Sequence, residues 1–180
     1  MIWFLFACVE EPVKAGCETC GGDCAVETEP AASARHVEGE VDYAVYPPAG
    51  GDHDACWAEW GVHTDVVQPE NFVHNLEHGG VVFVYAAELP AEDLASLTTF
   101  VASLPQGRAI LTPASDPMDA LVAAVAWEHR IRLGCYDQAA LEAFFWDNVA
   151  NAPEDVTSDP GTCAMDDDTG DTGDTGDTGR

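Results

Sequence analysis

Apolar side chains recur at alternating helical and strand spacings between Pro69 and Val149, and this pattern constrains the fold more than any other feature of the sequence. The stretch Pro69–His78 has helical spacing, begins with a proline that suits the first helical position, and is followed by Gly79, a common helix terminator. Val81–Tyr85 is a run of β-branched and aromatic residues, which is typical of a buried strand. The pattern therefore predicts a short helix that leads directly into a sheet.

Four further elements are expected after this strand: a helix over 91–104, a short strand over 109–112, a long strand over 121–133, and a helix that begins after Asp137. The order after His78 is then β-α-β-β-α. This order follows an N-terminal loop-helix unit, and together they predict an α+β fold with a small mixed or antiparallel sheet.

The charge of the chain is strongly negative. Its 180 residues include 33 Asp or Glu against 6 Lys or Arg, which gives a formal net charge of −27. This balance excludes nucleic acid and anionic membrane surfaces as partners, because both require a basic patch. Residues 156–180 end in a stretch of Asp-Thr-Gly repeats that has no apolar side chain, so we expect a disordered tail. The repeats lack the ligand spacing of an EF-hand loop, which argues against a calcium site.

The N-terminal segment resembles the signal of a bacterial lipoprotein. Residues 1–8 comprise a short apolar run, a small residue and Cys8, which would carry the lipid. The run is too short to span a bilayer, so we expect membrane contact only through the lipid anchor. The alternative is an apolar N-terminal segment with an unmodified cysteine. The lipoprotein interpretation predicts an exported protein of the cell envelope, with a Cys-rich acidic linker over 9–34 and a globular domain over 35–155.

Six cysteines remain after Cys8 is set aside, and an even number in an exported chain favours disulfide bonds. The sequence does not determine their pairing. Three of them form a cluster with Cys-x-x-Cys spacing that could instead bind a soft metal ion, although a second such pair is missing. The disulfide candidates are Cys17, Cys20, Cys24, Cys56, Cys135 and Cys163.

The segment from His74 to His78 carries the clearest chemistry in the chain. Two imidazoles four positions apart on a helix face the same side and can reach one ion, so the pair predicts a metal site. His53, on a loop rich in proline and glycine, is expected to supply a third ligand. The alternative is that both helical histidines lie at the surface near the helix end, where a positive charge is favourable. Further candidate ligands are His36, Asp52, Glu77 and Met118.

The same five residues spell His-x-x-Glu-His, the inverted zincin motif, in which Glu77 would act as the general base. A glutamate from further along the chain, Glu142 or Glu154, would then complete the zinc site. The chain is too small for the large architecture of those peptidases. We therefore favour a binding protein over an enzyme, with zinc-dependent hydrolysis as an alternative.

Short motifs in the globular part carry a resemblance to a known family. They are His36, Tyr43, Pro47-Pro48-Ala-Gly-Gly-Asp-His53, Trp60-Gly61-Val62, Pro69-Glu70, His74-Asn-Leu-Glu-His-Gly-Gly80-Val-Val, Thr112-Pro113, Ala126-Trp127 and Ala152-Pro153-Glu154. In this order they resemble the bacterial domain-of-unknown-function family DUF3105, from about residue 36 to residue 154. The resemblance implies an exported or membrane-anchored protein and no particular reaction.

By this resemblance His36, His53, His74 and His78 occupy motif positions of the family. The chain departs from the usual pattern in the loop before His53, where Ala-Gly stands in place of Thr-Ser. It also has His63 where tyrosine is usual, which makes His63 the least favoured ligand.

The leading hypothesis is a lipid-anchored metal-binding protein that holds copper or zinc through His53, His74 and His78. Imidazole suits both metals, and the exported setting together with Met118 slightly favours copper. A third hypothesis is a structural module of the envelope in which the histidines only form hydrogen bonds. The sequence does not reveal whether the protein has a protein partner.

Overall fold

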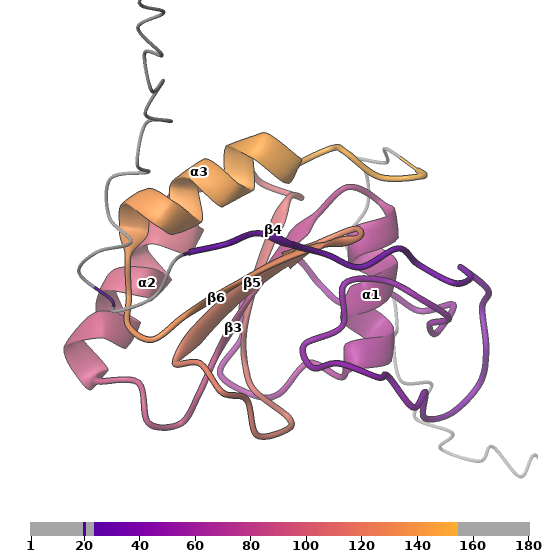
Figure 1. Cartoon of the computed structure of the whole chain (residues 1–180), viewed down its shortest axis with the longest axis horizontal. Coiled ribbons are helices and arrows are strands. Elements are labelled where there is room, and N and C mark those ends of the chain that lie inside the picture. The colour runs from indigo at the N-terminus through magenta and orange to yellow at the C-terminus, as the bar shows by residue number, and fades with distance from the viewer. Residues whose placement is uncertain (1–19, 21–23, 155–180) are drawn as a thin grey trace, which may run out of the picture.

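The computed structural model describes residues 20 and 24–154, and in this part of the chain it confirms the α+β class with a mixed sheet. The elements are β1 (Glu27–Thr28), β2 (Gly61–Val62), α1 (Pro69–Glu77), β3 (Val81–Tyr85), α2 (Ala91–Ser103), β4 (Ala109–Pro113), β5 (Val122–Ala126), β6 (His129–Leu133) and α3 (Gln138–Asn148). The strands lie in the order β1-β6-β5-β3-β4-β2 (Figure 1).

Parallel and antiparallel pairs divide the sheet into two halves. β2, β4 and β3 run parallel to one another, whereas β5 pairs antiparallel with β3, and β6 and β1 continue the antiparallel half. β3 and β4 can be parallel because α2 returns the chain between them.

The two faces of the sheet pack against different helices. Along β3, Val81 and Phe83 join the core cluster that contains residues of α2 and α3, whereas Val82 and Val84 join a second cluster with α1. This alternation follows from the two-residue period of a strand. Figure 1 shows α2 and α3 on one side of the sheet and α1 with its preceding loops on the other. Because both faces are covered, β3 is apolar throughout, as the sequence predicts.

The segment 121–133 is a β-hairpin rather than the single long strand that its sequence suggests. The chain turns at Trp127 and Glu128, between β5 and β6. These residues carry no local turn signal, because the turn lacks glycine, proline and asparagine. Glu128 takes a left-handed φ of +62°. Tertiary contacts support it: its N–H donates to the carbonyl of Ala49 at 2.6 Å, and its carboxylate accepts the N–H of Ala31 at 2.9 Å.

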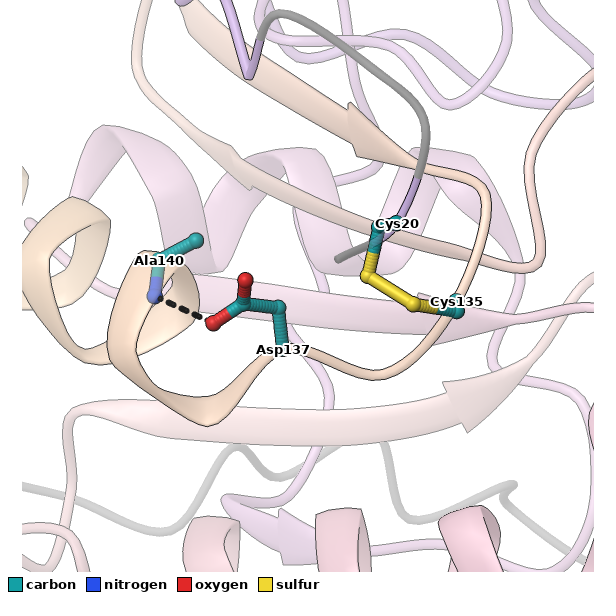
Figure 2. Close-up of a disulfide and its surroundings, with 4 residues drawn as sticks. All are labelled: Cys20, Cys135, Asp137 and Ala140. Atoms are coloured by element: carbon teal, nitrogen blue, oxygen red, sulfur yellow. Dashed lines mark hydrogen bonds between the residues drawn. A yellow bond between two sulfur atoms is a disulfide. The ribbon is translucent and has the colours of Figure 1, made fainter. Parts of the chain in front are cut away.

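The residues before the domain are attached to the sheet. The pair 27–28, which we expected in the linker, forms the edge strand β1 against β6. A disulfide between Cys20 and Cys135 links this region to the start of α3 (Figure 2). In the same view the carboxylate of Asp137 accepts the N–H of Ala140 at 3.1 Å, which confirms the capped start of this helix.

Of the other cysteines predicted to form disulfides, the structure describes Cys24 and Cys56. Cys24 is disulfide-bonded as well. Cys56 lies half-buried in the loop before α1. Cys8, Cys17 and Cys163, with the segments predicted as signal and tail, lie outside the described residues. Within residues 20 and 24–154, no helix is both long enough and apolar enough to cross a membrane.

Candidate metal centre

Helix α1 carries His74 in its last turn and ends at His78. The helix begins with Pro69 and ends where Gly79 takes a left-handed φ of +81°, as the sequence predicts. Both histidines are buried, with exposed fractions of 5% and 6%. The alternative of two surface histidines is therefore wrong.

The histidine-bearing face of α1 is covered by the loop 51–58. From the helix, the side-chain amide of Asn75 accepts the N–H of Ala58 and donates to its carbonyl, both at 2.9 Å. The amide of Asn71 donates to the carbonyl of Cys56 at 2.9 Å. Two asparagines four positions apart thus hold the loop against the helix, over the buried histidines.

The same loop carries His53 to the helix, and the segment 35–37 pairs with it and brings His36 to the same place. His53 is fully buried, and its backbone N–H and carbonyl bond to Arg35 at 3.0 Å and Val37 at 2.8 Å. These bonds form an isolated parallel bridge between His36 and His53. The exposed His36 thereby places its ring centroid 5.1 Å from that of His53 and 4.8 Å from that of His74.

Two sets of side chains lie close enough to bind metal ions. The first ligand group consists of His36, His53, His74 and Glu77, and the second ligand group consists of Glu77, His78 and Glu154. Within each group the ligand atoms all lie within 4.8 Å of one another. Glu77 belongs to both groups, so its carboxylate lies between them.

Hydrogen bonds indicate which imidazole nitrogen is available in the first ligand group. Nδ1 of His53 lies 2.8 Å from the carbonyl oxygen of Gly51, and Nδ1 of His74 lies 2.8 Å from that of Asp54. A carbonyl only accepts hydrogen bonds, so we infer that each Nδ1 carries a hydrogen and each Nε2 of the neutral ring carries a lone pair. Histidines that bind metal through Nε2 commonly have such a carbonyl behind them.

Nε2 of His53 faces the carboxylate of Glu77 in the interior of the domain. The two atoms Nε2 and Oε2 lie 3.1 Å apart, yet this nitrogen is buried without a hydrogen-bond partner. A lone pair opposite a carboxylate oxygen is unfavourable unless a positive charge lies between them. A proton between the two atoms or a metal ion bound by both side chains would remove this conflict.

The second ligand group joins the end of α1 to the chain that follows α3. The N–H of Ala150 donates to the carbonyl of Gly79 at 2.9 Å, and the N–H of Glu154 donates to the carbonyl of Glu77 at 3.0 Å. These backbone bonds position Oε2 of Glu154 at 3.4 Å from Nε2 of His78. Of the two glutamates predicted as further ligands, Glu154 therefore lies beside the helix.

Burial keeps the helical imidazoles uncharged. Burial lowers the pKa of His74 to about 4, against the opposing effect of its bond to Asp54 and with the support of the neighbouring imidazoles. Burial also lowers the pKa of His78, although the carboxylate of Glu154 acts in the opposite direction. Both rings are therefore neutral at pH 7, which is the state in which histidine binds metal.

Every residue of the two ligand groups lies in the part of the chain that matches a known family model. The model of a family described as "Protein of unknown function (DUF3105)" matches residues 36–161, which is more than half of the chain. The chain belongs to the DUF3105 family. The resemblance found in its motifs is thereby confirmed. Comparisons with curated proteins and with solved structures give no match.

Several residues predicted as possible ligands in this DUF3105 domain lie outside both ligand groups. Asp52 forms an ion pair with Arg35 at 2.7 Å, and this guanidinium holds the pKa of the Asp52 carboxyl well below its usual range. Met118 packs against the cluster beneath α1 and lines a separate cavity of about 570 Å³. His63 is exposed and bonds to a backbone carbonyl of its own loop at 2.8 Å. Glu142 is exposed on α3.

Two residues of the DUF3105 domain shape the centre without being predicted to do so. The ring of Trp57 packs edge-on against that of His78, with a centroid distance of 4.0 Å, and against His74 at 5.1 Å. Asn75 holds the covering loop. The sequence does contain a signal for the role of Asn75 in holding the loop. Asn71 and Asn75 are four positions apart on the polar side of α1, next to the histidines.

Proposed function

We propose that this DUF3105 domain binds a divalent transition-metal ion, zinc or copper(II), through His36, His53, His74 and Glu77. The observation that carries the proposal is the buried Nε2 of His53, which lies 3.1 Å from Oε2 of Glu77 without a hydrogen bond. An ion at this place would be bound by both side chains. Three imidazoles and a carboxylate form a donor set that suits zinc and copper(II).

The donor set also indicates an oxidation state for copper. Cu(I) prefers thiolate and thioether ligands, whereas imidazole and carboxylate suit Cu(II) and Zn(II). Neither ligand group contains a cysteine, and Met118 packs against the apolar cluster beneath α1. We therefore favour the divalent ions over Cu(I).

Metal content measured by elemental analysis tests this proposal. The full-length chain is equilibrated with ZnCl2 or CuCl2, desalted and analysed beside His53→Ala and His36→Ala. We expect the wild type to retain more metal than either variant, because each variant removes a ligand of the first ligand group. His53 is buried, and its substitution could prevent folding. His36 is exposed, so we expect His36→Ala to fold normally and to test the same ligand group. His63→Ala is the matched control, because it removes an exposed histidine outside both ligand groups. Wild-type protein that retains no more metal than His53→Ala would contradict the proposal.

A zinc-dependent hydrolase is the second candidate function, and the position of Glu154 favours it. The zincin motif needs a further glutamate ligand, and Oε2 of Glu154 lies 3.4 Å from Nε2 of His78. In that case Glu77 would be the general base rather than a ligand. The Glu77→Gln variant separates the two roles: a lost base abolishes turnover and leaves metal content intact, whereas a lost ligand lowers metal affinity.

We further propose that the domain acts in the cell envelope, attached through a lipid on Cys8. The disulfide between Cys20 and Cys135 supports this setting, because such bonds persist in oxidising compartments. Fractionation of expressing bacteria tests the anchor. Wild-type chain should incorporate labelled fatty acid and sediment with membranes, and Cys8→Ala should do neither. Equal labelling of both forms would contradict the anchor.

A further inference from the structure

We propose that the centre holds two metal ions, with the carboxylate of Glu77 bridging them; this inference rests on the metal binding proposed above. The first ion would lie in the first ligand group, and the second would lie between Glu77, His78 and Glu154. The ligand atoms of each group lie within 4.8 Å of one another, and Glu77 is the residue that the two groups share. A carboxylate has two oxygens, so one side chain can bind one ion through each.

The position of His78 is compatible with a second ion once the first ion is bound. Its ring is buried, and its Nδ1 has no hydrogen-bond partner among the described residues. Its Nε2 lies 3.1 Å from Nε2 of His74. Once the lone pair of His74 binds the first ion, it can no longer accept a hydrogen bond from His78. The other neighbour of this nitrogen is Oε2 of Glu154 at 3.4 Å, and a second ion between them would bind the Nε2 lone pair, with the ring hydrogen on Nδ1.

Glu154 completes the second ligand group from a fixed position. Its N–H donates to the carbonyl of Glu77 at 3.0 Å, and its Oε2 lies 3.4 Å from Nε2 of His78. The side chain of Glu154 is 58% exposed, so a second ion would have protein ligands on one side and water on the other. We therefore expect weaker binding at this position than at the first, which has two buried imidazoles.

Charge explains why the two ions need a shared carboxylate. Two divalent ions repel each other strongly in a protein interior, and paired sites hold them about 3.5–4 Å apart between common ligands. Glu77 and Glu154 contribute two negative charges, while the imidazoles contribute none in their neutral form. The remaining positive charge would attract hydroxide or an anionic ligand on the exposed side of the second ion.

Metal stoichiometry of the full-length chain tests the two-ion centre. After equilibration with excess ZnCl2 and desalting, we expect two equivalents in the wild type and one equivalent in Glu154→Gln and in His78→Ala. Glu154 is exposed, so its variant preserves the fold. Glu142→Gln is the matched control, since it neutralises an exposed glutamate on α3 outside both groups and should keep two equivalents.

Copper(II) provides a second readout. Two copper ions that share the Glu77 carboxylate couple magnetically, so the electron paramagnetic resonance signal should account for fewer spins than the measured copper. Glu154→Gln should show one spin for each copper.

Each outcome has a definite meaning. One equivalent in the wild type, or the same stoichiometry in Glu154→Gln as in the wild type, overturns the two-ion centre and leaves the single-ion proposal standing. A wild-type chain that retains neither zinc nor copper overturns both.

Discussion

The side chain of Asn75 forms two hydrogen bonds with the backbone of Ala58, each 2.9 Å long. Asn75 is fully buried in α1, and Ala58 lies in the loop 51–58 that also carries His53. The pair therefore fixes the distance between the helical histidines and the histidine of the loop. The geometry of the centre depends on a residue that is not itself a ligand candidate.

Asn75→Ala should destabilise the domain by about 2–4 kcal/mol, because it leaves both backbone groups of Ala58 without their partner. Chemical denaturation of the metal-free protein measures this loss. Asn151→Ala, an exposed asparagine, is the control and should change the free energy of unfolding by less than about 0.5 kcal/mol. Equal denaturation midpoints for the two variants would show that the Asn75 bonds do not hold the loop.

Metal binding should raise the stability of the native protein. An ion that binds only the folded state, and not the unfolded chain, raises the free energy of unfolding. The increase is about 2.7 kcal/mol when the free ion concentration is one hundred times the dissociation constant. Thermal unfolding with zinc and then with excess chelator measures the difference. A structural module in which the histidines only form hydrogen bonds predicts the same melting temperature in both conditions. Zinc should raise the melting temperature of His53→Ala by less than it raises that of the wild type.

The sequence predicts α1 and its histidines because their signals are local. The proline, the apolar spacing and Gly79 define the helix, and a separation of four positions puts His74 and His78 on one side of it. The α+β class follows from similar local patterns in β3, α2, β4 and α3. Burial of the histidines on the side opposite the core is a consequence of the covering loop, which the periodicity of the helix does not reveal.

Features that depend on distant contacts were predicted less well. The turn at Glu128 is supported by the backbone of Ala31 and Ala49, so its own neighbours give no turn signal. His36 reaches the centre through a single bridge to His53, which no local pattern around His36 predicts. Asp52 adjoins His53 in sequence, but its carboxylate is used by Arg35.

The metal-free protein should lose stability as the pH falls from about 6.5 towards 4, the interval between the ordinary pKa of histidine and the lowered pKa of His74. In this interval the unfolded chain binds a proton at His74 that the folded chain does not, so acid favours unfolding. His78 acts in the same direction. Denaturation midpoints across this range, in the presence of chelator, measure the effect.

His74→Gln isolates the contribution of this imidazole from that of the carboxylates, which also titrate at the acid end of the interval. Its stability should fall less steeply with decreasing pH than that of the wild type. Parallel pH profiles for the two proteins would contradict the assignment to His74.

Arg130→Met should destabilise the domain by about 1–3 kcal/mol, because Arg130 is buried and makes contacts that methionine cannot replace. Its guanidinium donates to the carbonyl of Pro47 at 2.7 Å and pairs with Glu29, so it joins β6 both to the loop that leads to His53 and to the residue that follows β1. The Arg130→Met variant should also bind metal more weakly, because the loop that Arg130 holds at Pro47 positions His53. Arg132→Met, two positions along the same strand, removes two more exposed ion pairs and should cost only about 0–1 kcal/mol. Chemical denaturation and zinc titration of both variants measure these effects, and a larger loss for Arg132→Met would contradict the role assigned to the buried arginine.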